Sequence, residues 1–241
     1  MRRTTLLVAA TVLLFGLSVV PVAAQSAIST EQTAEFVPNP DWGQGHYARI
    51  ETDAGRIIAR LLPDQAPQSV AHFAAMAMGE LEWLDVVTGE TRKGRYYDGI
   101  PIHNVRPGRL FEAGDWTGTG QGAPPIYVPA EGAGPVNFSQ SGRLGMAKSG
   151  TRLSAVQFFA TYAAQPELNR VFPCFGMVIE GLEVILQISS SKSYNNGKPM
   201  EPVLIQTIEI FTIGNPGPIP LAEQIPTRKK KLELRPHLKR D

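Results

Sequence analysis

Hydrophobic and polar positions change their spacing along the chain, and each spacing predicts a different element. The stretch HYARIETDAGRIIARLL, which begins at His46, alternates on both sides of TDAG, as the two strands of a β-hairpin do. In DQAPQSVAHFAAMAMGE the apolar residues recur at helical spacing, and Gly79 follows as a helix end. The apolar positions of this predicted helix are Val70, Phe73, Ala74 and Ala77. The folded region therefore begins with a hairpin and a helix.

Short apolar runs at close spacing make up the rest of the folded region. They are PIHNV, RLFEAGD, GRLGMA, VQFFATY, CFGMVI and VLIQTIEIF, and Gly or Pro separates most of them. This spacing predicts a closed or sandwiched antiparallel sheet. A second helix is predicted in EGLEVILQISS, where Leu182, Ile185 and Leu186 share one stripe. The pattern alone thus predicts a β-barrel or sandwich with two helices.

The N-terminal segment, residues 1–24, has the features of a secretory signal peptide. MRRTTLLVAATVLLFGLSVVPVAAQS begins with two arginines, continues with an apolar run, and closes on the small-residue pattern Val22-Ala23-Ala24. The alternative is an uncleaved membrane anchor, since the run is nearly long enough to span a bilayer. We therefore predict a protein that is exported to the periplasm or secreted, with a mature chain that begins near Gln25.

Two further segments flank the predicted domain, which covers residues 46–213. Residues 25–45 are polar and rich in turn-forming residues, which predicts a flexible lead-in. Residues 214–241 are Pro-rich and then basic, with a charge run at 228–231. Such a tail is either solvated or contacts the cell envelope, a membrane surface or an acidic partner.

The composition excludes several classes of protein. A net charge of +1 and a hydrophobic content of 43% fit neither a disordered chain nor a nucleic-acid binder. The single cysteine, Cys174, cannot form an internal disulfide and lies in the apolar run VFPCFGMVI, so we expect a buried, inert thiol. The four histidines show no metal-ligand spacing, so neither a metal nor another cofactor is predicted. We expect a monomer.

Taken in order, the segments resemble those of the cyclophilins, peptidyl-prolyl isomerases built as an eight-stranded barrel capped by two helices. The resemblance covers residues 46–213. It rests on APQSVAHFAAMAMGE, YYDGIPIHNVRPGRLFEAGD, TGTGQGAPP, RLGMAKSG, VQFFATYAAQPELN and VFPCFGMVIEGLEVILQI. The excursion around Thr88-Gly89 also resembles a loop of exported bacterial members. The fold that this resemblance implies is all-β, a closed eight-stranded antiparallel barrel with two α-helices.

The implied activity is the cis-trans isomerisation of X-Pro bonds in proline-containing polypeptides. Rotation about such a bond is slow because its partial double bond carries a barrier of about 18–20 kcal/mol. No covalent bond is made or broken, so neither a nucleophile nor a metal is required. An apolar pocket with a cationic hydrogen-bond donor suits this reaction. In the family, an arginine directly after a strand histidine is that donor.

The resemblance also shows where this chain departs from the family. His103 is followed by Asn104, so the family arginine is absent from its own position. Arg109 stands where the family usually has a pocket phenylalanine, Leu110 at a methionine position, and Glu112 at a glutamine position. The resemblance implies a catalytic set of His103, Asn104, Arg109 and Gln157. It implies a substrate-binding set of Leu110, Glu112, Ala147, Lys148, Phe159, Leu168 and Phe172.

Some members of these sets match the family and others depart from it. Those that match by position and type are His103, Gln157, Phe159, Ala147 and Leu168. Those that depart, besides the ones already named, are Lys148, Phe172 in place of a pocket histidine, and Glu167 in place of an aromatic residue found in some members. Losing the charged donor costs about 1.5–3 kcal/mol, or about 10- to 150-fold in rate. We therefore predict an isomerase with reduced activity.

Two arginines are candidates to replace the lost cation. Asn104 and Arg106 point to the same face of an extended strand, because side chains alternate with period two. Arg109 follows the Pro107-Gly108 turn at a pocket position. We interpret Arg106 as a solvated rim residue and Arg109 as the source of electrostatic assistance. The alternatives to catalysis are a non-catalytic proline-peptide binding module, which Asn104 favours, and a chaperone-like scaffold whose partners bind the basic tail.

Overall fold

A computed structural model describes residues 36–132 and 134–222. The compact unit that carries the fold begins at Pro38. The predicted signal peptide and the basic charge run of the tail lie outside the described residues. Within those residues, no helix combines the length and the apolar character that crossing a membrane requires.

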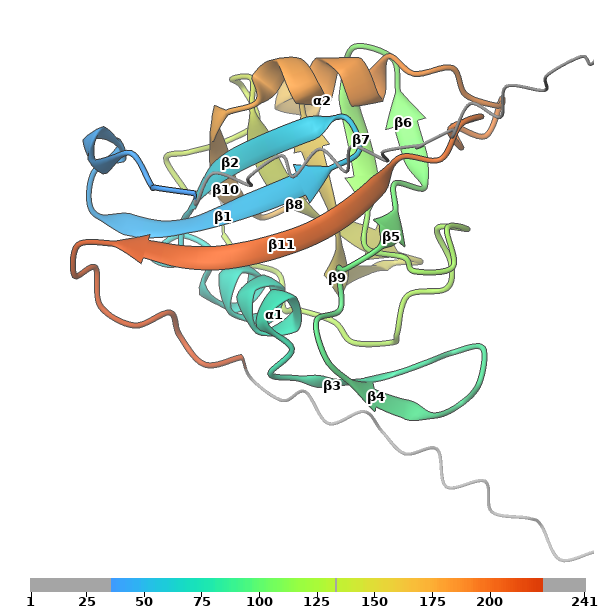
Figure 1. The fold of residues 1–241 in the computed structure, drawn as a ribbon, viewed down its shortest axis with the longest axis horizontal. Coiled ribbons are helices and arrows are strands. Elements are labelled where there is room, and N and C mark those ends of the chain that lie inside the picture. The colour runs from blue at the N-terminus through green and yellow to red at the C-terminus, as the bar shows by residue number, and fades with distance from the viewer. Residues whose placement is uncertain (1–35, 133, 223–241) are drawn as a thin grey trace, which may run out of the picture. The chain divides into compact units, whose positions relative to one another are not determined.

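The fold is built on antiparallel β-strands that form one large sheet and one small hairpin. The strands of the large sheet are β1 (Gly45–Thr52), β2 (Gly55–Leu61), β5 (Ile100–Pro101), β6 (Asn104–Arg106), β7 (Leu110–Ala113), β8 (Arg143–Ser149), β9 (Arg152–Thr161), β10 (Cys174–Glu180) and β11 (Leu204–Ile213). Their order is β5-β11-β1-β2-β10-β8-β9-β7-β6. The small hairpin consists of β3 (Glu82–Leu84) and β4 (Thr91–Lys93), around the predicted Thr88-Gly89 excursion, and it projects from the sheet in Figure 1.

The predicted all-β architecture is confirmed, but the predicted closed barrel of eight strands is not. The curled sheet has nine strands and is open between β5 and β6. Between these two short strands the backbone changes its hydrogen-bond partner from the β11 side to β7. Ile102 N donates to Val203 O at 2.9 Å, and His103 N donates to Glu112 O at 3.1 Å. Because this segment turns from one edge of the sheet to the other, it does not form a continuous ladder with both.

The predicted hairpin and first helix are both present. Strands β1 and β2 pair around the TDAG turn with Thr52 opposite Gly55. Helix α1 (Pro67–Met78) begins with a proline, which suits the first helical position, and ends at Gly79 in the left-handed conformation with φ 76°. The first turn is capped by a residue distant in sequence, since the Glu131 carboxylate accepts from Gln68 N at 2.6 Å and Ser69 N at 3.0 Å.

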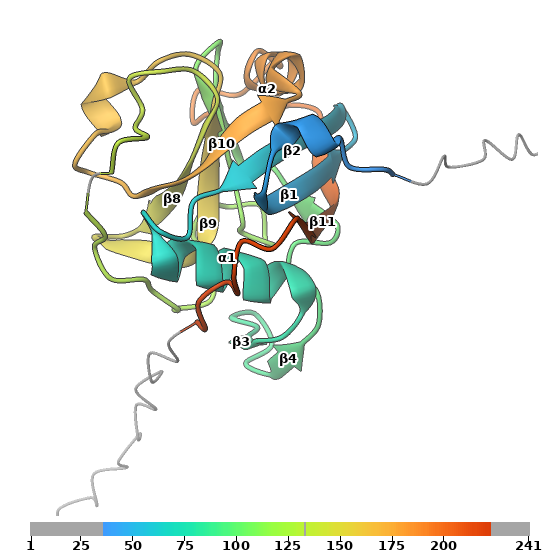
Figure 2. The same ribbon diagram turned by 90° about the vertical axis from the view of Figure 1, so that its left-hand side faces the viewer.

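Helix α2 (Leu182–Ser189) confirms the second predicted helix but buries a different stripe. Ile185 is buried as expected, whereas Leu186 is exposed, and Val184 and Ile188 are buried in its place. In Figures 1 and 2 the sheet lies between the two helices, α1 on one side and α2 on the other. Contacts agree with this arrangement, since α1 packs against β9, β10 and β11 and α2 against β2, β6 and β7.

The residues just before β1 are ordered in the structure. Pro40–Trp42 form a short 3-10 helix, η1. The hydroxyl of Tyr47 on β1 donates to Trp42 O at 2.7 Å and to Gly43 O at 2.8 Å. Part of the segment that the sequence predicts to be a flexible lead-in is therefore attached to the sheet by a buried tyrosine.

Strand β9 contributes to two separate apolar clusters. Phe158 and Met146 belong to the main core, where the Phe73 and Phe158 rings lie 5.3 Å apart, centroid to centroid. Phe159 and Ala147 belong to a second cluster. Cys174 is in that second cluster, and its burial raises the pKa of the thiol to about 11, so the predicted burial of this cysteine is confirmed. The alternation of side chains along β8 and β9 thus separates core from groove.

Gly114, directly after β7, provides a test of this packing. It has φ 94°, and a Cβ there would overlap the backbone carbonyl of Val156 on β9. We expect Gly114→Ala to lower the free energy of unfolding by about 4 kcal/mol or more, because backbone strain and overlap combine. The control Gly108→Ala has φ 65° and open space, so it carries only the left-handed cost of about 1–2 kcal/mol. Urea unfolding of both variants measures the difference, and equal losses would contradict it.

Candidate functional site

The predicted substrate-binding residues meet in one pocket of about 310 Å³, here called the central pocket. Strands β6, β7, β8 and β9 and the segment around the short 3-10 helix η2 (Pro166–Leu168) supply its walls. Its lining residues are Arg106, Leu110, Glu112, Ala147, Lys148, Phe159, Leu168 and Phe172. Every residue of the predicted substrate-binding set is among them, and Arg106 is the one addition.

Aromatic packing holds the apolar wall of the central pocket in place. The Phe159 ring lies edge-on to Phe172, with centroids 5.3 Å apart, and it also packs against Phe138 at 5.3 Å. Phe159 pairs across the sheet with Glu112 on β7 and with Gly145 on β8. A side chain at Gly145 would collide with the Phe159 ring, so the glycine provides the space that this ring occupies. The wall is therefore rigid and apolar, which suits the burial of a small ring.

A second, polar cavity of about 370 Å³ adjoins the central pocket and shares Glu112 and Lys148 with it. Its lining residues are His103, Asn104, Glu112, Gly118, Thr119, Gly120, Lys148, Gln157, Asn196 and Lys198. Three of the predicted catalytic residues, His103, Asn104 and Gln157, thus lie beside the central pocket rather than in its wall. The buried Gln157 side chain donates from Nε2 to Gly120 O at 3.1 Å.

Arg109 is the predicted catalytic residue that lines neither cavity. Its guanidinium donates from Nε to Gln165 Oε1 at 2.7 Å and forms an ion pair with Glu167. Arg106 lines the central pocket instead, with Nη2 3.7 Å from Glu112 Oε1. Arg109 turns away from the pocket because the segment beside the Pro107-Gly108 turn offers it two acceptors, Gln165 and Glu167. Arg106, which the sequence led us to interpret as a solvated rim residue, is therefore the arginine that lines the central pocket.

Glu112 is the carboxylate between the two cavities, and its surroundings act on it in opposite directions. Burial raises its pKa, while the Arg106 charge and a hydrogen bond from Asn104 lower it, and the pKa remains above its ordinary value. Asn104 and Glu112 face each other directly in the β6–β7 ladder. The carboxylate thus depends on both neighbours for compensation of its charge.

His103 is held in the neutral form. Burial lowers its pKa more than the negative charge of Asp115 raises it. Its Nε2 lies 4.0 Å from Glu112 Oε2, and among the residues that the structure describes its buried Nδ1 has no hydrogen-bond partner. A neutral ring with this geometry can fill space and accept or donate one hydrogen bond, but it carries no charge to the site near pH 7.

Two loops shape the polar cavity, and sequence reasoning missed the residues that organise them. The Asp115 carboxylate accepts from Thr117 N at 2.9 Å and Gly122 N at 2.9 Å, which closes the loop that carries Gly118 and Gly120. A second loop after α2 brings Lys198 to the cavity. The pattern Asp-x-Thr-x-Thr at 115–119 is a signal for the first loop. No local signal marks Lys198.

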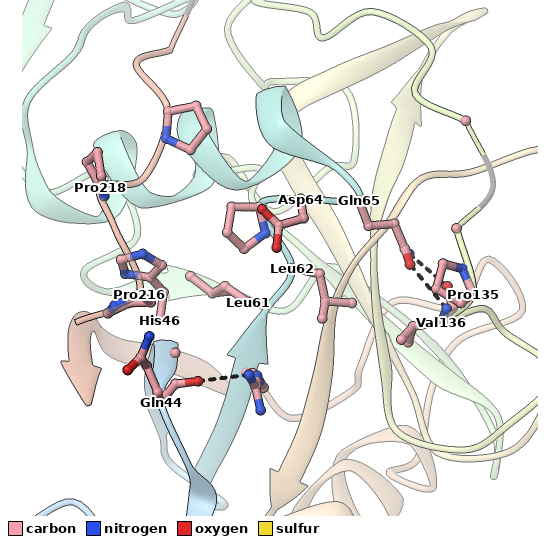
Figure 3. A pocket seen from close by; sticks show the side chains of 16 residues that line it. Gln44, His46, Leu61, Leu62, Asp64, Gln65, Pro135, Val136, Pro216 and Pro218 are labelled. Atoms are coloured by element: carbon pink, nitrogen blue, oxygen red, sulfur yellow. Dashed lines mark hydrogen bonds between the residues drawn. The ribbon is translucent and has the colours of Figure 1, made fainter. Parts of the chain in front are cut away.

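A further pocket of about 660 Å³, larger than the two cavities above, contains none of the predicted site residues. Figure 3 shows residues from three parts of the chain around it: Gln44 just before β1 and His46 in that strand, Leu61 at the end of β2 with Leu62, Asp64 and Gln65 after it, and Pro216 and Pro218 beyond β11. Gln44 Nε2 donates to Asn215 O at 2.9 Å, which attaches the Pro-rich segment to the domain. This pocket, whose lining includes Leu62, Val136, Arg60 and Asp64, is therefore separate from the two cavities that hold the predicted site residues.

Known proteins resemble this chain over the region that contains both cavities. Residues 47–210 match the family model described as Cyclophilin type peptidyl-prolyl cis-trans isomerase/CLD. Peptidyl-prolyl cis-trans isomerase A of Mycobacterium tuberculosis is 34% identical over 165 residues, 68% of this chain and 91% of that protein. Peptidyl-prolyl cis-trans isomerase B of Streptomyces anulatus is 33% identical over 169 residues, 69% of this chain and 97% of that protein.

A solved structure is similar as well. It is that of a Cryptosporidium parvum cyclophilin type peptidyl-prolyl cis-trans isomerase in the presence of the dipeptide Ala-Pro. The TM-score is 0.57 and the sequence identity 27%, over 68% of this chain and 98% of that one.

Proposed function

Since this chain belongs to the cyclophilin-type peptidyl-prolyl cis-trans isomerases, we propose that the central pocket receives the proline ring of an X-Pro unit in an exported polypeptide. The observation that carries the proposal is the meeting of an aromatic wall and a guanidinium, that of Arg106, in one pocket. The similar Cryptosporidium parvum protein was crystallised in the presence of Ala-Pro, which supports a proline-containing ligand.

The proposed reaction needs binding and one directed charge. Burial of the ring against Phe159 and Phe172 holds the proline side of the bond, while the preceding residue rotates. When the amide twists, its nitrogen regains a lone pair and resonance with the carbonyl is lost. A donor that meets the twisted amide better than either planar form lowers the barrier.

Arg106 is placed to be that donor. It lies two residues after Asn104 on the same strand face, so its side chain extends towards the position that the family arginine occupies. Glu112 holds the guanidinium at the pocket, and a guanidinium stays charged under all relevant conditions. Its side chain is 56% exposed, so water screens the charge. We therefore propose an activity lower than that of members with arginine at position 104.

A proline-peptide binding module is the second candidate, and Asn104 is the observation that favours it. An asparagine can donate one hydrogen bond to a peptide carbonyl but supplies no charge. In that case the central pocket binds proline peptides without accelerating rotation. The scaffold hypothesis, in which partners bind the basic tail, concerns residues outside the described chain.

Substituting Arg106 and Asn104 one at a time tests the isomerase proposal. We expect Arg106→Gln to reduce kcat/KM about tenfold in a protease-coupled assay, because one charged hydrogen bond is lost. Asn104→Arg should raise kcat/KM by a similar factor. Peptide affinity, measured by calorimetry, should change much less than kcat.

The matched control is Arg109→Gln, the same substitution at the other end of the same turn. It should leave kcat/KM within about twofold of the original protein, because Arg109 lines neither cavity. If Arg109→Gln lowers the rate and Arg106→Gln does not, the assistance comes from Arg109, as the sequence analysis predicted. Peptide binding without turnover in the original protein would instead establish the binding module.

The pKa of Glu112 predicts a pH dependence. Because that pKa lies above its ordinary value, the carboxylate takes up a proton at a higher pH than an ordinary glutamate does, and then no longer holds Arg106. Activity should be constant from neutral to weakly alkaline pH, where His103 stays neutral, and should fall as the pH drops through the pKa of Glu112. Magnetisation-exchange NMR measures isomerisation directly at each pH. Glu112→Gln should show lower activity with no acidic decline, and persistence of that decline would assign it to another group.

We also propose that the protein is exported after cleavage of residues 1–24. Mass spectrometry of protein recovered from the envelope or medium of an expressing cell should give a mature chain that begins at Gln25, since Ala24 and Val22 meet the small-residue requirement. Ala24→Leu removes that requirement and should leave the segment attached. An exported chain that retains Met1 without the substitution would identify the segment as an anchor.

A further inference from the structure

We propose that the polar cavity is a specificity subsite for a carboxylate side chain, so that the isomerase prefers prolines with Asp or Glu close by in the polypeptide. The inference rests on the proposed function, since it requires a proline peptide in the central pocket. The carrying observation is the presence of two lysines, Lys148 and Lys198, in the lining of one cavity that adjoins this pocket.

The two lysines come from distant parts of the chain. Lys148 follows Ala147 on β8, and its Nζ lies 5.3 Å from the centroid of the Phe172 ring. Lys148 lines both cavities, whereas Phe172 lines only the central pocket, so this lysine stands where the two cavities meet. Lys198 lies on the loop after α2, which a bridge between Ser193 and Pro199 closes. The lining of the polar cavity therefore includes one lysine from β8 and one from the loop after α2.

Neither lysine has a carboxylate partner among the residues that the structure describes. The carboxylate of the cavity itself, that of Glu112, lies 3.7 Å from Arg106, whose positive charge offsets it. Asp115 is fully buried and accepts hydrogen bonds from its own loop. His103 is neutral near pH 7. The charges that face the cavity thus leave an excess of positive charge.

The neutral groups of the cavity fit the same ligand. Asn104 and Asn196 line the cavity, and their amides are able to donate hydrogen bonds to a carboxylate oxygen. A cavity with an excess of positive charge raises the local concentration of anionic ligands. A basic side chain in the same place would meet like charge, so the cavity discriminates by repulsion as well as attraction.

The adjoining position of the cavities limits where the carboxylate stands. Successive residues of an extended peptide are about 3.3–3.6 Å apart. A peptide whose proline fills the central pocket therefore places a side chain one or two residues away over the polar cavity. The preference should appear at one position within two residues of the proline and be absent at the others.

A peptide series measures this preference in the coupled assay. Four peptide sets carry Glu, Gln, Ala or Lys at one of the two positions before or after the proline. We expect kcat/KM for the Glu peptide to exceed that for the Gln peptide by about threefold to fivefold at low ionic strength, because an exposed ion pair contributes a factor of about this size. The ratio should approach one at high salt, because both lysines are exposed.

Charge reversal assigns the preference to the cavity. Lys198→Glu should reverse the ratio, so that kcat/KM is higher for the Lys peptide than for the Gln peptide, and higher for the Gln peptide than for the Glu peptide. The matched control is Lys192→Glu, at an exposed lysine on the same loop that does not line the cavity. It adds the same charge and should leave the ratio unchanged.

The outcomes separate this inference from the proposed function. If the original protein isomerises the Ala peptide but treats Glu and Gln alike at every position, the subsite is disproved and the isomerase stands. An equal shift in Lys192→Glu and Lys198→Glu would also disprove it, since the effect would then be one of net charge. If no peptide is isomerised, calorimetric titration of the same peptides still shows whether Glu is preferred.

Discussion

The structure depends on one constraint, the burial of both faces of strand β9. Phe158 packs inward against Phe73 and the main core, while Phe159, its neighbour in sequence, packs outward against Phe138 and Phe172. Since side chains alternate along a strand, a shift of the β9 register by one residue would turn Phe159 into the core and Phe158 towards the pocket. The absence of a side chain at Gly145 leaves room for the outward ring. The register of β9 therefore determines the stability of the domain and the shape of its pocket together.

The electrostatics of the site follow from the same rigid sheet. A carboxylate half-buried beside an aromatic wall is costly unless cations or donors compensate for it, and Glu112 obtains this from Asn104 and Arg106. Asn104 and Glu112, which face each other in the β6–β7 ladder, thus belong to one charge balance. The loops that carry Gly120 and Lys198 then add polar groups around this scaffold, which is where binding specificity is usually found.

The sequence by itself determined the elements and most of the pocket. The hairpin, both helices and the alternation of Phe158 and Phe159 follow from local periodicity, which depends only on neighbouring residues. The whole predicted substrate-binding set lies in one pocket because family resemblance preserves strand register, and register fixes the face on which each residue lies. The absence of arginine at position 104 was equally evident from the order of the residues.

Only the tertiary structure decided which long side chains serve the site and how the sheet ends. Arg109 turns to Gln165 and Glu167 rather than to the pocket, because a flexible arginine takes the direction of acceptors that a distant segment provides. The packing of distant segments likewise brings Lys198 to the polar cavity and Glu131 to the first turn of α1, without any local signal. The sheet stays open between β5 and β6 because hydrogen-bond partners, not periodicity, determine where a strand stops.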